Sequence, residues 1–186
     1  MAEHRSEECV ATGSGDGAAR VLATLGLGSN LGEREQHLAV ACSALRNLPH
    51  TDWVDASRVF ETDPVGGPPQ GPYLNAVVRI RTGLAARALL ESLLEIERLG
   101  GRERGGPRFG PRSLDLDLLL YGDNRVDEVG LQVPHPRLPQ RRFVLAPLCD
   151  LAAAERHPVL GDSFAELLRK LPDDAAGVRV IDGLSL

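Results

Sequence analysis

Apolar and polar residues alternate along two stretches of the chain, residues 73–82 and 114–121. A period of two is typical of β-strands, whose successive side chains point to opposite faces of a sheet. In the first stretch, Asn75 therefore lies on the face opposite the aliphatic side chains. In the second, leucines occupy one face, and Asp115 and Asp117 share the other.

Two longer stretches repeat their apolar residues every three to four positions, which is the period of an α-helix. The first predicted helix covers residues 33–48 and is ended by Pro49, and the second covers residues 84–99 and is ended by a pair of glycines. Mostly apolar residues at 21–27 predict a strand before the first helix, and another strand is expected within 53–62.

Three shorter elements are expected in the C-terminal part of the chain. They are a helix near residues 143–151, a helix at 162–171 with Asp162 as its N-cap, and a strand at 178–181. The full order of strand, helix, strand, strand, helix and strand is that of a ferredoxin-like unit. We therefore predict an α+β fold in which an antiparallel sheet carries flanking helices, packed on one face.

The composition is that of a single globular domain: 186 residues, of which 42% are hydrophobic and 25% charged. Residues 1–20 lack the basic and apolar stretches of a signal peptide, so we expect a flexible leader there and the folded domain at 21–186. The net charge of −5 argues against a general nucleic-acid-binding protein.

Cysteine usage and hydropathy indicate the cellular compartment of the protein. The three cysteines, Cys9, Cys42 and Cys149, are odd in number and form no Cys-x-x-Cys pair, which argues against a disulfide framework or a zinc ribbon. No apolar run approaches the ~18 residues needed to span a bilayer. We therefore expect a cytoplasmic protein that does not bind membranes.

Asp115 and Asp117 are the first candidates for chemistry. Two residues apart on a strand, their Cα atoms lie roughly 6–7 Å from each other and both side chains project from the same face. Carboxylate oxygens without histidine or thiol partners favour magnesium, which is often held by one or two carboxylates and by the phosphates of a substrate. The alternative is that both aspartates simply line the solvent side of the sheet.

An arginine-rich segment precedes this strand. Arg102, Arg104, Arg108 and Arg112 fall within eleven residues, interspersed with glycines. The planar guanidinium matches phosphate oxygens, so arginines next to metal-binding carboxylates indicate phosphoryl transfer. A solvated basic loop or a nucleic-acid contact remains the alternative. A phosphate-binding P-loop, a complete dinucleotide fingerprint and the protein-kinase motifs are all absent from the sequence.

Another group of residues suits a flat polar heterocycle. Tyr73 and Phe143 could stack on its faces, while the amide of Asn75 offers a donor and an acceptor to its edge. Both aromatics could equally be core residues. His135 stands between two prolines and could donate to a phosphate, or it could serve only as a turn residue.

Four runs of residues occur together in order along the chain: Gly28-Ser29-Asn30-Leu31-Gly32, Tyr73-Leu74-Asn75, Gly110-Pro111-Arg112-Ser113-Leu114-Asp115-Leu116-Asp117 and Val133-Pro134-His135-Pro136-Arg137. Over approximately residues 22–150 the chain thereby resembles the 6-hydroxymethyl-7,8-dihydropterin pyrophosphokinase family of folate biosynthesis. The resemblance implies transfer of the β,γ-diphosphate of ATP to the pterin hydroxymethyl group, with release of AMP.

The resemblance also implies roles for individual residues. Asp115 and Asp117 would hold two Mg²⁺ ions, and Arg102 and Arg112 would be catalytic. Contacts to ATP are implied for Glu97, Arg104, Arg112, Leu118, His135 and Arg141. Contacts to the pterin are implied for Thr62, Val65, Tyr73, Asn75 and Phe143. The segments 66–72 and 100–111 would be mobile lids, and Phe109 departs from the family pattern, in which tryptophan is common.

Two rival functions are compatible with the predicted fold. A non-enzymatic RNA-binding or regulatory module could be built on a ferredoxin-like sheet, but the sequence lacks the aromatic signature of such RNA-binding proteins. An ordinary kinase that transfers only the γ-phosphoryl group would need the same carboxylates and arginines. We expect ATP and the pterin as the only partners, no nucleic acid, and a monomer.

Overall fold

The computed structural model describes residues 19–101, 110–172 and 177–186. Within them lies one antiparallel sheet in the order β5-β1-β4-β3-β8, with β2 also pairing with β4. The strands of this sheet are β1 (Val21–Ser29), β2 (Thr51–Ala56), β3 (Phe60–Thr62), β4 (Tyr73–Thr82), β5 (Asp115–Tyr121) and β8 (Val178–Val180). The predicted α+β fold with an antiparallel sheet is confirmed.

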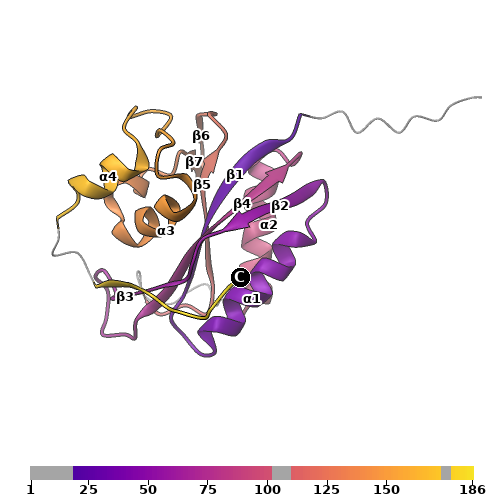
Figure 1. The fold of residues 1–186 in the computed structure, drawn as a ribbon. Coiled ribbons are helices and arrows are strands. Elements are labelled where there is room, and N and C mark those ends of the chain that lie inside the picture. Colours follow the sequence, from indigo (N-terminus) through magenta and orange to yellow (C-terminus); the bar gives the residue numbers. More distant parts are fainter. Residues whose placement is uncertain (1–18, 102–109, 173–176) are drawn as a thin grey trace, which may run out of the picture.

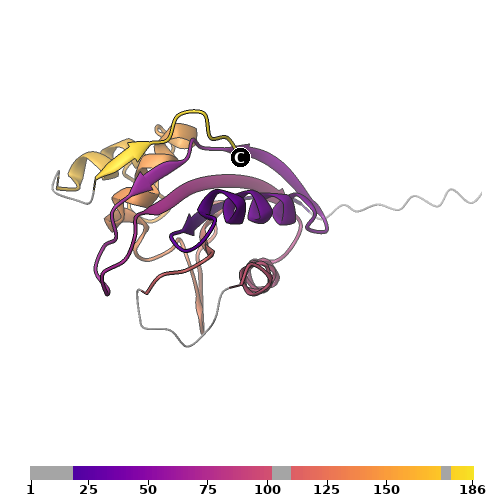
Figure 2. The ribbon, with the colours of Figure 1, turned by 90° about the horizontal axis from the view of Figure 1, so that it is seen from below.

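Helices α1 (Arg34–Arg46) and α2 (Ala86–Leu99) cover one face of the sheet (Figure 1). Figure 2 shows both helices on the same side of the long, curved strand β4. Their buried side chains recur every three to four positions and pack against aliphatic side chains of β1 and β4 in the larger hydrophobic core. Both helices lie inside the ranges predicted from their periodicity.

The opposite face is covered by α3 (Arg142–Ala152) and α4 (Phe164–Lys170) (Figure 1). The expectation of helices on one face therefore holds for α1 and α2 but not for these two. The physical reason lies in the strands, because Val77 and Leu119 point away from the larger core and are fully buried in a second cluster. Apolar side chains on both faces of a sheet need cover on both faces.

The strand expected within residues 53–62 is divided into β2 and β3. Ser57 separates them: its backbone N–H donates to the Val77 carbonyl at 2.8 Å, and its hydroxyl accepts from the Val77 N–H at 2.9 Å. A side-chain oxygen thus replaces a backbone partner at this point, which interrupts the ladder along β4.

The C-terminal part contains elements that the pattern placed only approximately. Residues 126–133, which were not predicted to form strands, make a hairpin of β6 (Val126–Glu128) and β7 (Leu131–Val133). A short 3₁₀ helix, η1 (Leu138–Gln140), precedes α3. The N-cap of α4 is Ser163 and not Asp162, because Ser163 and Glu166 form a reciprocal capping box.

Among the described residues, no helix is long and apolar enough to cross a membrane. The leader expected at residues 1–20 falls almost entirely outside the described residues, so this expectation stays a prediction. The same holds for the monomeric state.

Candidate active site

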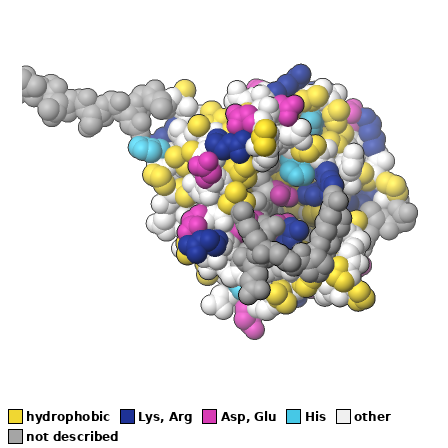
Figure 3. Space-filling model, turned by 180° about the vertical axis from the view of Figure 1, so that it is seen from behind, with side chains coloured by type: hydrophobic (Ala, Val, Ile, Leu, Met, Phe, Trp, Pro, Cys, Tyr) yellow, Lys and Arg dark blue, Asp and Glu magenta, His cyan; other side chains and the backbone are white. Residues whose placement is uncertain are grey.

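A cavity of about 300 Å³ opens on the side of the sheet that faces α3. Side chains from β1, β3, β4, β5 and the start of α3 line it, together with the loop between β3 and β4. In the view from behind (Figure 3), acidic, basic and histidine side chains gather in the middle of one face. A cavity of this volume suits a small-molecule ligand.

Asn75 and two glycines lie next to one another in the lining of the cavity. Gly26 and Gly28 lie on β1 opposite Val77 and Asn75 of β4. A Cβ atom at Gly28 would stand 3.2 Å from Oδ1 of Asn75, so the glycine makes room for the amide. The amide nitrogen of Asn75 donates to the Thr62 hydroxyl at 2.7 Å, which fixes the orientation of the buried amide.

Asp115 and Asp117 project from the same face of β5 into the cavity, as the alternation predicted. Each carboxylate is paired with an arginine: Arg112 Nη1 lies 2.8 Å from Asp115 Oδ1, and Arg141 Nη1 lies 2.9 Å from Asp117 Oδ2. All four side chains are partly exposed, so water screens both ion pairs and each can be exchanged for another partner at low cost.

The two aspartates fit a magnesium ion better than a metal held by protein ligands alone. The described residues contain no group of three or more histidine, cysteine, aspartate or glutamate side chains that could hold a metal. Magnesium needs only one or two carboxylates when phosphates and water complete its octahedron. Asp115 and Asp117 would therefore hold such an ion jointly with a phosphorylated substrate.

Glu97 and Leu118 were expected to contact ATP, and the structure brings neither into the cavity. Glu97, 1% exposed on α2, accepts a hydrogen bond from the Leu116 N–H at 2.7 Å. Through this bond Glu97 anchors β5 from the side of the larger core, at Leu116, which lies between the two aspartates. Leu118 is 4% exposed and packs in the larger core. Both side chains lie on the face of β5 opposite the carboxylates.

His135 lies close to the site without lining it. The backbone N–H of His135 donates to the backbone carbonyl of Leu119 at 2.8 Å, which joins the residue to β5. Burial lowers the pKa of the imidazole, and the positive charges of Arg141 and Arg137 lower it further, against the opposing effect of Asp117. His135 is therefore neutral at pH 7 and can both donate and accept.

Asn30 joins the two sides of the site, a role that the sequence analysis did not assign. Its Oδ1 accepts from the Arg112 N–H at 2.7 Å, and its Nδ2 donates to Gln70 Oε1 at 2.9 Å and to the Gly71 carbonyl at 3.2 Å. The Tyr73 hydroxyl also bonds to Gln70 Oε1, at 3.3 Å. The loop after β3 and the segment before β5 are thus connected through one amide.

The expected pterin-binding residues are brought together, since all five line the cavity: Thr62, Val65, Tyr73, Asn75 and Phe143. Of the expected phosphate-side residues, Arg112, Asp115, Asp117 and Arg141 line it as well. Arg102, Arg104 and Phe109 lie outside the described residues, as does most of the second expected lid.

Sequence reasoning missed three polar lining residues, Asp63, Gln70 and Arg137. Two of them carried a signal that could have been used. Gln70 is the only polar side chain in the glycine- and proline-rich stretch 64–72, and Arg137 ends the run that contains His135. A polar residue inside such shaped loops is a candidate for binding.

The chain resembles a known protein family and several curated proteins. The model of the family 7,8-dihydro-6-hydroxymethylpterin-pyrophosphokinase (HPPK) matches residues 24–153. A 2-amino-4-hydroxy-6-hydroxymethyldihydropteridine pyrophosphokinase of Pseudomonas aeruginosa is 42% identical over 146 residues, which cover 78% of this chain and 89% of the relative. The enzyme of that name from Bacillus subtilis is 42% identical over 130 residues, which cover 70% and 77%.

Solved structures support the fold. The Plasmodium falciparum HPPK-DHPS protein has a TM-score of 0.64 at 14% identity, over 81% of this chain. This chain spans only 44% of that protein, and an identity so low bears on the fold alone. Because the family model covers residues 24–153 and two relatives reach 42% identity, the chain belongs to the 7,8-dihydro-6-hydroxymethylpterin-pyrophosphokinase family.

Proposed function

We propose that this pyrophosphokinase of folate biosynthesis transfers the β,γ-diphosphate of ATP to the hydroxymethyl group of 6-hydroxymethyl-7,8-dihydropterin and releases AMP. The observation that carries the proposal is a single cavity with two chemically different walls. One wall presents Asp115 and Asp117 with their arginine partners, and the other presents Asn75 together with Tyr73 and Phe143. Family membership favours this enzymatic function over a non-enzymatic RNA-binding or regulatory module.

Asn75 and its neighbours suit the pterin. A pterin is flat and carries adjacent donors and acceptors on its edge, which a carboxamide can match. Because the amide nitrogen of Asn75 already donates to Thr62, the remaining N–H and the carbonyl oxygen would face the ring edge. Tyr73 and Phe143 would stack on its faces, and Val65 would close the open side of the cavity.

Asp115 and Asp117 suit a divalent cation that arrives with ATP. We infer two Mg²⁺ ions, which Asp115 and Asp117 would hold. When bound, magnesium neutralises the phosphate charge and polarises the phosphoryl oxygens. The arginines that now pair with the carboxylates would turn to the phosphates, so that Arg112 and Arg141 hold the triphosphate. Arg102 and Arg104 are proposed to assist them, and His135 to donate to a phosphate oxygen.

The reaction follows from this arrangement. The pterin hydroxyl oxygen attacks the β-phosphorus, a new P–O bond forms, and the bond from that phosphorus to the oxygen bridging to the α-phosphate breaks. The hydroxyl proton passes to solvent water, and AMP leaves with the bridging oxygen. Arg112 would neutralise the negative charge that builds up on the transferring group, which helps most when the contact is stronger in the transition state.

The decisive experiment is to incubate the purified protein with ATP, magnesium and 6-hydroxymethyl-7,8-dihydropterin and to identify the nucleotide product by chromatography. AMP that forms only in the presence of the pterin is the expected result. ADP would identify an ordinary kinase that attacks the γ-phosphorus. No turnover would contradict the proposal and return attention to a binding module.

A further inference from the structure

The C-terminal residues 177–186 lie beyond the stretch that the family model matches, yet they contact the wall of the cavity. Strand β8 pairs antiparallel with β3, so that Val178 stands opposite Thr62 and Arg179 opposite Glu61. Thr62 is the residue that holds the amide of Asn75. A single strand, β3, therefore separates β8 from β4, the strand that carries Asn75.

Arg179 and Arg34 share the carboxylate of Glu61. Nε of Arg179 donates to Glu61 Oε2 at 3.0 Å, and Nη1 of Arg34 donates to Glu61 Oε1 at 2.9 Å. The Glu61 side chain is only 12% exposed, and these two guanidinium groups hold its pKa below the ordinary value. Nη1 of Arg34 also donates to the Pro72 carbonyl at 2.8 Å. These contacts run from the C-terminal strand through Glu61 and Arg34 to Pro72, the last residue of the loop 63–72.

Gly177 makes a separate contact with the same loop. Its N–H donates to Asp63 Oδ2 at 3.2 Å, and a Cβ atom at this position would come within 3.3 Å of that oxygen. Asp63 is the first residue of the loop and lines the cavity. The N–H of Ile181 donates to the Val59 carbonyl at 2.9 Å, and Ile181 packs against the larger core. The segment is thus fixed at one end and touches the loop at the other.

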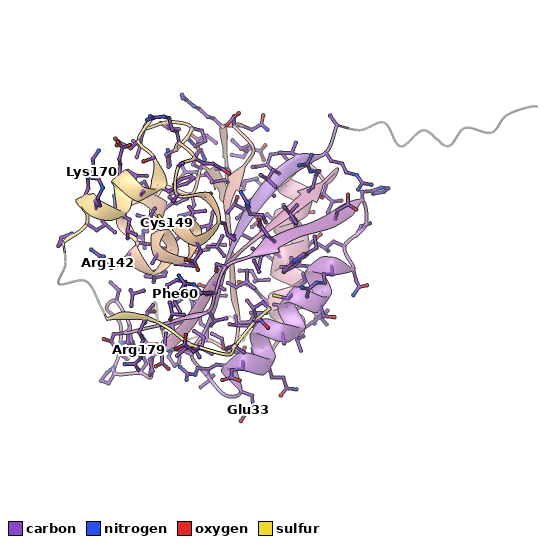
Figure 4. All side chains as sticks on the ribbon, viewed as in Figure 1. Glu33, Phe60, Arg142, Cys149, Lys170 and Arg179 are labelled. Carbon is purple, nitrogen blue, oxygen red and sulfur yellow. The ribbon has the colours of Figure 1, made fainter. Side chains whose placement is uncertain are left out.

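We propose that the C-terminal segment 177–181 positions the loop 63–72 for the pterin, with Arg179 as its main positioning residue. The inference rests on the proposed function, because it assigns this loop to the pterin side. Figure 4 shows Arg179 on the side of the molecule that carries β3, next to the strand of Phe60. Cover for the edge of β3 alone would not require a carboxylate shared with Arg34, which also donates to the Pro72 carbonyl.

The test measures steady-state kinetics of the full chain with Arg179→Ala. The Arg179 side chain is 70% exposed, so the loss should be moderate: the KM for the pterin is expected to rise about three- to fivefold, with kcat and the KM for ATP unchanged. Arg179→Lys keeps the charge and should restore about half of the effect on a logarithmic scale. Arg87→Ala, which breaks an exposed ion pair with Glu128, is the matched control and should change neither KM.

A second variant reaches the same loop through a different contact. Gly177→Ala places a methyl group against Asp63 and should raise the pterin KM in the same direction, by about twofold. An unchanged pterin KM in both variants, or an equal change in Arg87→Ala, would overturn the proposal. So would a parallel loss of kcat and thermal stability, because that pattern indicates structural support only. Absence of AMP with the unmodified protein would instead contradict the proposed function.

Discussion

The two faces of the central sheet are built from the same strands but differ in chemistry. On β4, Ala76, Val78 and Ile80 are buried against α1 and α2, whereas Asn75 and Val77 line the cavity on the other side. Strand β5 repeats the division, with Leu116 and Leu118 buried in the larger core and Asp115 and Asp117 lining the cavity on the other side. Side-chain alternation along a strand thus lets one rigid ladder support both a hydrophobic core and a polar site.

The two faces also differ in the interactions that their side chains make. The core face excludes water and is stabilised by apolar burial. The site face holds polar groups that satisfy one another: Arg112 with Asp115, Arg141 with Asp117, and Asn75 with Thr62. Such pairs contribute little to stability where they are partly exposed. We therefore expect changes on the core face to affect stability and changes on the site face to affect turnover.

The largest effect is expected for Asp117→Ala. Loss of a carboxylate that binds magnesium should lower AMP formation by at least about a thousandfold, while thermal unfolding stays nearly unchanged. The matched control is Asp127→Ala, which removes an exposed aspartate of β6. Turnover that persists at saturating magnesium would contradict the assignment of the metal.

Leu118→Ala tests the core face of the same strand, one residue away. Because this side chain packs in the larger core, its truncation should lower the free energy of unfolding by about 2–5 kcal/mol. Denaturant unfolding measures this loss, and kinetics on the folded fraction should show an unchanged KM for ATP. A raised KM without a loss of stability would support the predicted contact between Leu118 and ATP.

Arg112→Ala should lower kcat about 100-fold and change the affinity for ATP much less. The reason is that its charge is needed most during transfer, when negative charge develops. Measurement of kcat beside ATP binding separates the two effects. If only the affinity falls, Arg112 serves to bind the ground state.

Asn75→Ala should raise the KM for the pterin about tenfold, which corresponds to the loss of one or two hydrogen bonds in a buried site. The KM for ATP should change far less, because Asn75 lies at the other wall of the cavity. Equal changes for both substrates would mean that the amide supports the cavity as a whole. Titration with each substrate separately checks this point.

The smallest effect is expected for the dependence of stability on pH. Burial lowers the pKa of both His135 and His157 below the ordinary value of 6.5. The unfolded chain then binds protons that the native state does not, so stability should be highest above pH 6.5 and decrease as the pH falls below it. His157→Asn should flatten this decrease in chemical denaturation. An unaltered slope would show that His157 does not contribute.

The sequence by itself determined the elements that follow a clear period. The alternation in 73–82 and 114–121 predicted which face holds Asn75 and which holds the two aspartates, and the three-to-four spacing predicted α1 and α2. The resemblance then indicated five residues that line the cavity, Thr62, Val65, Tyr73, Asn75 and Phe143, but not Asp63 or Gln70. Local periodicity suffices for such elements, because burial of one face repeats along each of them.

Short elements were decided by contacts that no local pattern encodes. The hairpin of β6 and β7 has three residues per strand, too few for a period to emerge, and Gly130 at φ 75° makes its turn. The break between β2 and β3 depends on Ser57 meeting Val77. The cover of both sheet faces likewise followed from the tertiary packing of α3 and α4.

The residue partnerships of the site were also decided by the tertiary structure alone. Asn30 meets Arg112 from 82 residues away, and Arg179 meets Glu61 from 118 residues away. Glu97 has the residue type of a ligand contact, yet the fold places it behind β5, where it holds the backbone of Leu116. A sequence shows which groups are available for chemistry, but which of them face one another depends on long-range packing, because only the folded chain brings distant residues within hydrogen-bonding distance.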